Sequence, residues 1–386
     1  MSTAPLAAPR RTAARQPTSP GRISGQQPLR RQDWAGRSPQ DILASYVPGK
    51  ADPLKVLEVL IALHNNRHTA LQKTVSHKTR QERARFLRRF FADIVGKAGF
   101  RRPPDPRNLG QKHIHGMVQV WQREKLAPAT IQTYLSFLRG LGSWMGKHGF
   151  VRKPEGYDLS LDEYQRHEVA QRDKSWAAKG IDVPAVLAEV ALFDPRVAAS
   201  MRLMDALGLR RKESVMHRPY AHVRPFDATG LPEDKKRADE YVRVKGKGGR
   251  VRWIPLETEP QRAAIAHART LVDSRDGHMG NPAHVLKRNL RRLDYALEKF
   301  GFTKAKRGVT GHGLRHGHLQ GLYQTVTGEP PPVRGGGAVA PDLERLARLI
   351  VSARAGHSRL RAAGAYLGQS VVMRSKASTS SEPTLK

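Results

Sequence analysis

The chain has 386 residues, of which 68 are Lys or Arg and 34 are Asp or Glu, so its formal net charge is +34. Such an excess of one sign destabilises a compact chain unless a polyanion neutralises it, and nucleic acid is the expected partner. The absence of cysteine excludes disulfide bonds, Cys-ligated zinc and a thiol nucleophile. No apolar run is long enough to span a bilayer, so no membrane partner is expected. The length predicts two or three domains, and the 39% hydrophobic content is enough for a buried core.

Residues 1–48 are predicted to be a disordered basic N-terminal arm. Prolines and arginines recur along this stretch, and its apolar content is too low to offset the entropy lost on ordering. It would serve either as a solvated tail or as an arm that follows DNA phosphates. Its beginning contains Arg, Ala and Ser and is nearly free of acidic residues, which is also the composition of a transit peptide.

Residues 49–150 are predicted to form a small helical domain with basic outer faces. The pattern of Leu87, Phe90, Phe91 and Ile94 repeats every three or four residues, as on one face of a helix. Another helix is expected to begin near Pro128 and to end by Gly146. The basic faces are either an ordinary solvated surface or, given the net charge, a contact with the DNA backbone.

A polar stretch at 151–180 is predicted to be a linker to a second, larger domain over residues 181–369. Helical patterning there is interrupted by two β-rich runs, Tyr241–Val244 and Val251–Pro255, which flank a glycine-rich turn and predict a hairpin. Residues 370–386 are predicted to be a C-terminal tail. The expected fold class is therefore mainly α with a small β-hairpin or sheet (α+β).

Four short segments of the second domain carry residues suited to phosphate chemistry. Taken singly, each has an ordinary structural explanation, such as a surface ion pair, a hairpin tip or half-buried packing. Their order is what is informative: an arginine before a glutamate, a lysine at the hairpin tip, a His-x-x-Arg on one helical face, and a Gly-His with a tyrosine nine residues later. The residues are Arg210, Glu213, Lys247, His312, Arg315, His357 and Tyr366.

In this order, the segments resemble the tyrosine recombinase, or phage-type integrase, family. The resemblance covers about 183–369, and the preceding helical domain is similar to that family's core-type DNA-binding domain. It implies that Arg210 and Arg315 bind the phosphate, because guanidiniums are always charged and fit phosphate oxygens in pairs. It further implies that His312 and His357 are donors or proton shuttles, that Lys247 is the general acid, and that Tyr366 is the nucleophile. Glu213 is expected to orient its neighbours.

The implied activity is site-specific cleavage and rejoining of double-stranded DNA through a 3′-phosphotyrosine, as in integration or excision of a mobile element. The resemblance also implies a homotetramer on paired sites, a possible accessory DNA-bending protein, no cofactor or metal, and a cytoplasmic location at the bacterial nucleoid. Alternatives are a catalytically silent DNA-binding relative and a basic RNA-binding protein, although no RNA module is found. A zinc site at His312 and His316 lacks the acidic spacing of a metalloprotease.

One stretch departs from the family pattern. The interval between Arg315 and His357 is longer than usual and contains three prolines at 330–332 and three glycines at 335–337. This loop, residues 328–341, is expected to be either an interaction loop or a neutral insertion.

Overall fold

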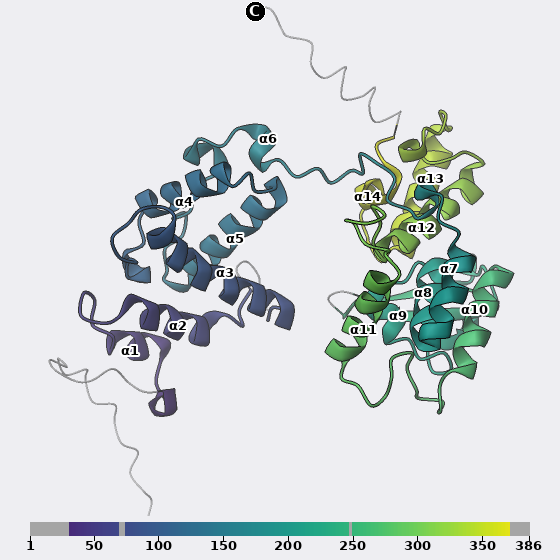
Figure 1. Ribbon diagram of the computed structural model, residues 1–386, viewed down its shortest axis with the longest axis horizontal. Coiled ribbons are helices and arrows are strands. Elements are labelled where there is room, and N and C mark those ends of the chain that lie inside the picture. The colour runs from purple at the N-terminus through teal and green to yellow at the C-terminus, as the bar shows by residue number, and fades with distance from the viewer. Residues whose placement is uncertain (1–30, 69–73, 247–248, 371–386) are drawn as a thin grey trace, which may run out of the picture. The chain divides into compact units, whose positions relative to one another are not determined.

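The computed structural model describes residues 31–68, 74–246 and 249–370. The chain divides into two compact units, with the boundary between Arg166 and His167 (Figure 1). The predicted class, mainly α with a small β-sheet, is confirmed. Among the described helices, none is long and apolar enough to cross a membrane.

The first unit is helical. Its longest helix, α3, begins after Ser76, whose hydroxyl accepts a hydrogen bond from the Thr79 amide at 3.2 Å and caps the first turn. The predicted apolar stripe of α3 is buried against the other helices, where Phe86 stacks on Tyr134 with ring centroids 4.4 Å apart. The helices of the unit are α1 (Pro39–Ala44), α2 (Pro53–His64), α3 (His77–Gly96), α4 (Gln111–Arg123), α5 (Pro128–Trp144) and α6 (Leu161–Tyr164).

The prediction of a disordered arm over residues 1–48 is wrong for its last part. Residues 39–44 form α1, and the side chains of Ile42 and Tyr46 are buried in the core of the first unit. The Ser38 hydroxyl accepts a hydrogen bond from the Asp41 amide at 3.1 Å, and Asp41 reaches back to the Ser38 amide, which starts the helix. Residues 1–30 lie outside the described residues.

The stretch predicted as a linker, 151–180, contains the boundary between the units, but much of it packs. Tyr157 belongs to the core of the first unit, where its hydroxyl donates to the Gln111 side chain at 3.0 Å. Trp176 belongs to the second unit, where it stacks on Phe302 with ring centroids 4.7 Å apart. These aromatic side chains bury large apolar surfaces, which explains why charge-rich sequence around them is ordered.

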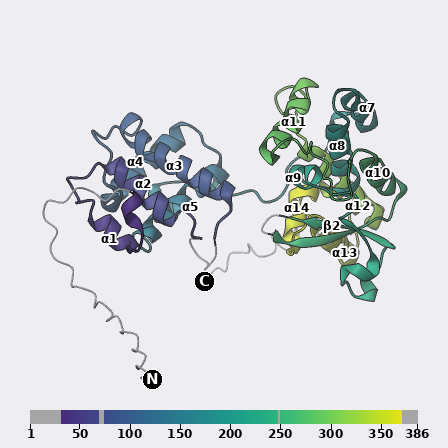
Figure 2. The same cartoon turned by 90° about the horizontal axis from the view of Figure 1, so that it is seen from below.

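The second unit combines helices with a three-stranded sheet. The antiparallel strands β1 (Val223–Pro225), β2 (Glu240–Lys245) and β3 (Val251–Pro255) lie in the order β1-β2-β3. The predicted hairpin is β2 and β3, in which Val244 pairs with Arg252. Figure 2 shows β2 near α13. The helices are α7 (Val183–Phe193), α8 (Pro195–Leu207), α9 (Arg211–Val215), α10 (Glu259–Thr270), α11 (Leu286–Lys299), α12 (His312–Thr327), α13 (Pro341–Arg354) and α14 (Gly364–Leu367).

Helix α12 links the main packing layers of the second unit. Leu314 of α12 lies in an apolar cluster with residues of α8 and α11. Leu319 of α12 lies in another cluster, with Val351 of α13 and Leu367 of α14. The four-residue helix α14 is too short to be stable by itself. Its position is therefore set by packing on α12 and α13, which places Tyr366 beside the N-terminal turns of α12.

Candidate active site

Arg210 lies at the start of α9, directly after the chain leaves α8. Gly208 ends α8 with φ 63°, in the left-handed region that favours glycine. The side chain of Arg210 donates from Nη1 to Glu213 Oε1 at 2.7 Å and from Nη2 to the Ala355 carbonyl at 2.8 Å. The second bond ties Arg210 to the end of α13, close to His357.

Glu213 is the anionic centre of the site. Arg252 of β3 donates from Nη1 and Nη2 to its two oxygens at 3.1 and 2.7 Å, and Arg210 adds a backbone hydrogen bond at 2.9 Å. Burial opposes ionisation, but the hydrogen bonds and charges of Arg252 and Arg210 outweigh it and lower the pKa of Glu213 to about 2. The carboxylate therefore binds both arginines, and its role as their orienting partner stays a prediction.

Arg315, in the first turns of α12, is completely buried. It donates from Nη1 to the Gly208 carbonyl and from Nη2 to the Ala355 carbonyl at 2.6 Å. The Ala355 carbonyl thus accepts from both Arg315 and Arg210, which brings the two predicted phosphate-binding arginines together. Their guanidiniums are held by backbone carbonyls from two distant parts of the chain.

Tyr366 of α14 meets Arg315 directly. Arg315 Nε donates to Tyr366 Oη at 3.3 Å, and the guanidinium lies 5.5 Å from the centre of the ring. The tyrosine side chain is 5% exposed, and its ring centroid is 6.2 Å from His312 and 4.9 Å from His316. The predicted tyrosine, histidine and arginine therefore form one cluster, although they come from separate segments.

The two predicted histidines, His312 and His357, lie at the exposed rim of this cluster. Partial burial of its ring and the nearby charges of Arg315 and Arg210 lower the pKa of His312 to about 4. Burial and the same two guanidiniums also lower the pKa of His357. Both imidazoles are thus held neutral by their surroundings near pH 7, the form in which a histidine accepts a proton.

A small cavity of about 200 Å³ opens beside these side chains. It is lined by Arg210, Gly246, Arg250, Arg252, Gly356 and His357. Gly356 has φ 72°, and a Cβ on it would lie 3.2 Å from Arg252 Nη1, so glycine is needed both for the turn and for the approach of the guanidinium. The cavity presents cationic side chains and backbone, which suits a phosphate group. Lys247 lies outside the described residues.

Three residues that the sequence analysis did not select belong to this site. Arg250 and Arg252 line the cavity, and His316 is buried against the ring of Tyr366. Burial and the neighbouring His312 lower the pKa of His316 to about 3. The available signal was the alternation in β3, which puts Arg252 on the same face as the buried Ile254.

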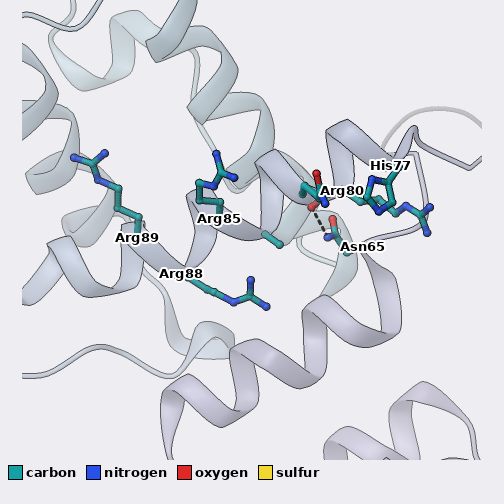
Figure 3. A pocket seen from close by; sticks show the side chains of 8 residues that line it. Asn65, His77, Arg80, Arg85, Arg88 and Arg89 are labelled. Atoms are coloured by element: carbon teal, nitrogen blue, oxygen red, sulfur yellow. Dashed lines mark hydrogen bonds between the residues drawn. The ribbon is translucent and has the colours of Figure 1, made fainter. Parts of the chain in front are cut away.

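A basic pocket occurs in the first unit, along α3 (Figure 3). Its cavity of about 770 Å³ is bordered by exposed Arg80, Arg85, Arg88 and Arg89. The Asn65 amide donates to the Arg80 carbonyl at 2.8 Å and fixes the floor of the pocket (Figure 3). The lining side chains are Asn65, His77, Arg80, Gln81, Ala84, Arg85, Arg88 and Arg89.

The paired and unpaired arginines of this pocket differ. Arg88 forms a bidentate pair with Glu58, with Nε–Oε1 and Nη2–Oε2 distances of 2.6 and 2.7 Å. Arg80 and Arg85 have no ion pair with a carboxylate of the described residues. Their charges are therefore available to an anionic partner.

Each of the two units contains a match to a known protein family. Residues 63–151 match the family described as phage integrase, N-terminal, and residues 170–319 match the integrase family. The tyrosine recombinase XerC of Stutzerimonas stutzeri is 23% identical over 222 residues, which cover 57% of this chain and 69% of that protein. XerC of Chromobacterium violaceum is 29% identical over 143 residues, or 34% of this chain and 41% of that protein.

Two solved structures extend the comparison. The XerH site-specific recombinase bound to its difH substrate has a TM-score of 0.48 at 15% identity, over 86% of this chain and 85% of that chain. The Tn1549 transposon integrase in complex with circular intermediate DNA has a TM-score of 0.47 at 15% identity, over 84% of this chain and 98% of that chain.

The integrase match and the two XerC relatives identify an enzyme that transfers DNA strands. With the family matches, the chain belongs to the tyrosine recombinases, the phage-type integrase family, whose members are site-specific DNA strand transferases. The integrase match ends at residue 319, before His357 and Tyr366. The roles of individual residues are therefore argued from the geometry of this chain.

Proposed function

We propose that this chain breaks and rejoins double-stranded DNA at a specific site with Tyr366 as the nucleophile. The observation that carries the proposal is the contact of Tyr366 Oη with Arg315 Nε at 3.3 Å. Arg315 shares the Ala355 carbonyl with Arg210, which lines the cavity. A phosphodiester in that cavity would meet the cationic side chains of Arg210, Arg250 and Arg252, and Tyr366 would attack it from the neighbouring buried cluster. This is the arrangement that an in-line displacement at phosphorus requires.

The proposed reaction begins when Tyr366 Oη attacks the phosphorus atom and the bond from phosphorus to the 5′-oxygen breaks. The phenol proton passes to a neutral imidazole, His312 or His357, whose lowered pKa values keep it able to accept one. The leaving 5′-oxygen takes a proton from Lys247. Its neighbours Gly246 and Arg250 line the cavity, which supports this assignment. The product is a 3′-phosphotyrosine. A second 5′-hydroxyl then attacks its phosphorus atom, which rejoins the DNA strand and releases Tyr366.

Arg210 and Arg315 are proposed to hold the nonbridging oxygens as negative charge develops in the transition state. Fixed guanidiniums stabilise such charge without reorganising, and each remains protonated at any accessible pH. Glu213 keeps Arg210 in place through the 2.7 Å bond to its Nη1. We also propose a role for each domain. Residues 49–150 bind the duplex as a core-type DNA-binding domain, and residues 181–369 form the catalytic domain.

The basic pocket of the first unit supports duplex binding. Exposed Arg80 and Arg85 would contact phosphates, since charge on Lys and Arg supplies most of the affinity of a protein for DNA. We also propose a homotetramer on paired sites, an accessory DNA-bending protein, integration or excision of a mobile element, and a cytoplasmic location at the nucleoid. Light scattering of the protein with paired duplexes tests the tetramer.

The activity is tested with a randomised pool of nicked duplexes, in which cleavage releases a short fragment and traps the covalent intermediate. Sequences that form an adduct are recovered and used as the selected nicked duplex. Digestion and mass spectrometry should place the nucleotide on the peptide containing Tyr366, and Tyr366→Phe should form no adduct while keeping its duplex affinity. An adduct on another residue would overturn the assignment, and binding without any adduct would favour a catalytically silent relative.

A further inference from the structure

The Pro/Gly-rich stretch after α12 is a compact turn. We call residues 330–336 the Pro/Gly turn. The Arg334 amide donates to the Pro331 carbonyl at 2.8 Å, and the Gly335 amide donates to the Pro332 carbonyl at 3.0 Å. A Cβ on Gly336 would lie 1.7 Å from the Pro330 carbonyl oxygen, so the two arms of the turn close tightly on each other. Prolines fix φ on one arm and glycines permit the close return, so the turn is rigid.

This turn packs against the end of α14, the helix that carries Tyr366. Gly368 has φ 83°, and a Cβ on it would lie 2.9 Å from the Val333 amide nitrogen. The Gly368 carbonyl accepts a hydrogen bond from Arg348 Nη2 at 3.1 Å. The backbone two residues after Tyr366 is thus enclosed between the Pro/Gly turn and α13.

Arg334 of the turn is also linked to Tyr366 through two side chains. Arg334 Nε donates to Asp173 Oδ2 at 2.8 Å. The other oxygen of Asp173, Oδ1, accepts from Gln320 Nε2 at 2.9 Å, and the same amide nitrogen donates to the Tyr366 carbonyl at 3.1 Å. Gln320 is fully buried. The relay Arg334–Asp173–Gln320–Tyr366 therefore ends on the backbone carbonyl of the proposed nucleophile.

Asp173 is the charged centre of this relay. Burial opposes its ionisation, but hydrogen bonds from Ser175, Gln320 and Arg334 outweigh burial and lower its pKa. Its side chain is 12% exposed, and that of Arg334 is 26% exposed. A carboxylate so little exposed needs its partners, so losing Arg334 would free Asp173 to turn towards water and release Gln320.

We infer that the Pro/Gly turn fixes the position of Tyr366, with Arg334 and Asp173 as positioning residues. The inference rests on the proposed role of Tyr366 as the nucleophile. A four-residue helix takes its position from such contacts, and a nucleophile displaced by about 1 Å can lose about a hundredfold in rate. The loop that departs from the family pattern is thereby part of the catalytic arrangement of this chain.

The test compares cleavage with binding on the selected nicked duplex. The rate constant for adduct formation is measured in a single turnover at saturating protein, and Kd by fluorescence anisotropy. Arg334→Ala should slow adduct formation about tenfold while Kd changes less than about twofold, because positioning acts on the chemical step. Arg334→Lys keeps a charge that reaches Asp173 and should recover most of the rate. Arg262→Ala, the matched control, loses an exposed arginine paired with Glu259 and should react normally.

A double-mutant cycle tests the relay itself. Asp173→Asn should slow adduct formation like Arg334→Ala, and the double variant should be no slower than the slower single variant, because both changes break one link. Multiplied effects, a normal rate in Arg334→Ala, or a loss confined to Kd would each overturn the inference. Failure of the proposed function looks different: Tyr366→Phe, assayed in parallel, would then still form the adduct.

Discussion

Arg252 of β3 and Glu213 of α9 form a bidentate ion pair, with N–O distances of 3.1 and 2.7 Å, in which both side chains are less than 10% exposed. The same carboxylate also binds Arg210. Two segments that are far apart in the sequence, β3 and the start of α9, are therefore held together by one charge, and removing that charge leaves two guanidiniums without their shared partner.

Glu213→Gln should consequently reduce the free energy of unfolding by about 3 kcal/mol at neutral pH, because a buried pair is broken on one side. The sign of its pH dependence follows from the lowered pKa. Glu213 titrates near 2 in the folded chain against an ordinary 4.5, so its stabilisation is complete above about pH 4.5 and is lost as the pH falls towards 2. Urea unfolding should be measured above and below pH 4.5. The difference in free energy of unfolding between variant and wild type should become smaller in acid.

The control for Glu213 is Glu298→Gln, which breaks a pair with Arg291 whose side chains are 51% and 59% exposed. Exposed pairs contribute little because water screens them, so Glu298→Gln should change the free energy of unfolding much less than Glu213→Gln does. The prediction would be contradicted if Glu213→Gln lowered the free energy of unfolding no more than Glu298→Gln does, or if its effect stayed constant in acid.

His312 should titrate far below the ordinary histidine range. Its pKa of about 4 reflects partial burial and the charges of Arg315 and Arg210. Because the folded value is depressed, the unfolded chain takes up the proton first, and stability should decline as the pH falls from about 6.5 to about 4. Ring-proton NMR of the free protein should show the low midpoint, and Arg210→Ala should raise it. A midpoint near 6.5 that Arg210→Ala leaves in place would disprove the electrostatic explanation.

Cleavage should need no divalent metal. Arg210 and Arg315 supply fixed positive charge at the phosphate, the task that magnesium performs in many nucleases. Adduct formation on the selected nicked duplex should therefore proceed at an unchanged rate in excess EDTA. Activity lost on chelation and restored by magnesium would instead indicate a nuclease-like site.

Duplex affinity should depend steeply on salt, falling about 10³–10⁵-fold between 50 and 200 mM if six to ten phosphates are neutralised per protomer. Within the basic pocket of α3, Arg85→Ala should reduce the slope of log K against log salt by about 1. Arg88→Ala is the matched comparison, because Glu58 already neutralises Arg88 and the slope should change less. Equal slopes for the two variants would show that the pairing does not matter.

Whether a feature could be predicted from the sequence depends on how far apart in the chain the residues that form it lie. Periodicity placed α3 and the β2–β3 hairpin because those patterns are local. Helix α1 was missed because the prolines and arginines around it outweighed the Ser38 and Asp41 cap and the single buried Ile42. The Arg334–Asp173 pair joins residues 161 positions apart and has no local signature at all. The contribution of Arg252 to the site could have been predicted, because a charged residue on the inward face of a strand requires a buried partner.

Lys247 provides the sharpest test of the proposed chemistry. As the general acid it protonates the departing 5′-oxygen, so Lys247→Ala should slow adduct formation on the selected nicked duplex by about 10²–10⁴-fold. Lys245→Ala is the matched control, since it removes an exposed lysine from the same hairpin at the end of β2. It should lower duplex affinity slightly and leave the single-turnover rate unchanged.

Replacing the 5′-bridging oxygen by sulfur then separates acid catalysis from DNA contact. A thiolate leaves without being protonated, since a thiol has a pKa of about 8.5 and an alcohol a far higher one. Lys247→Ala should therefore cleave the sulfur substrate at close to the wild-type rate, while Tyr366→Phe should remain inactive on it because no nucleophile is present. If sulfur fails to restore the Lys247→Ala rate, the lysine contributes only to the contact with DNA, and the assignment of Lys247 as the general acid is wrong.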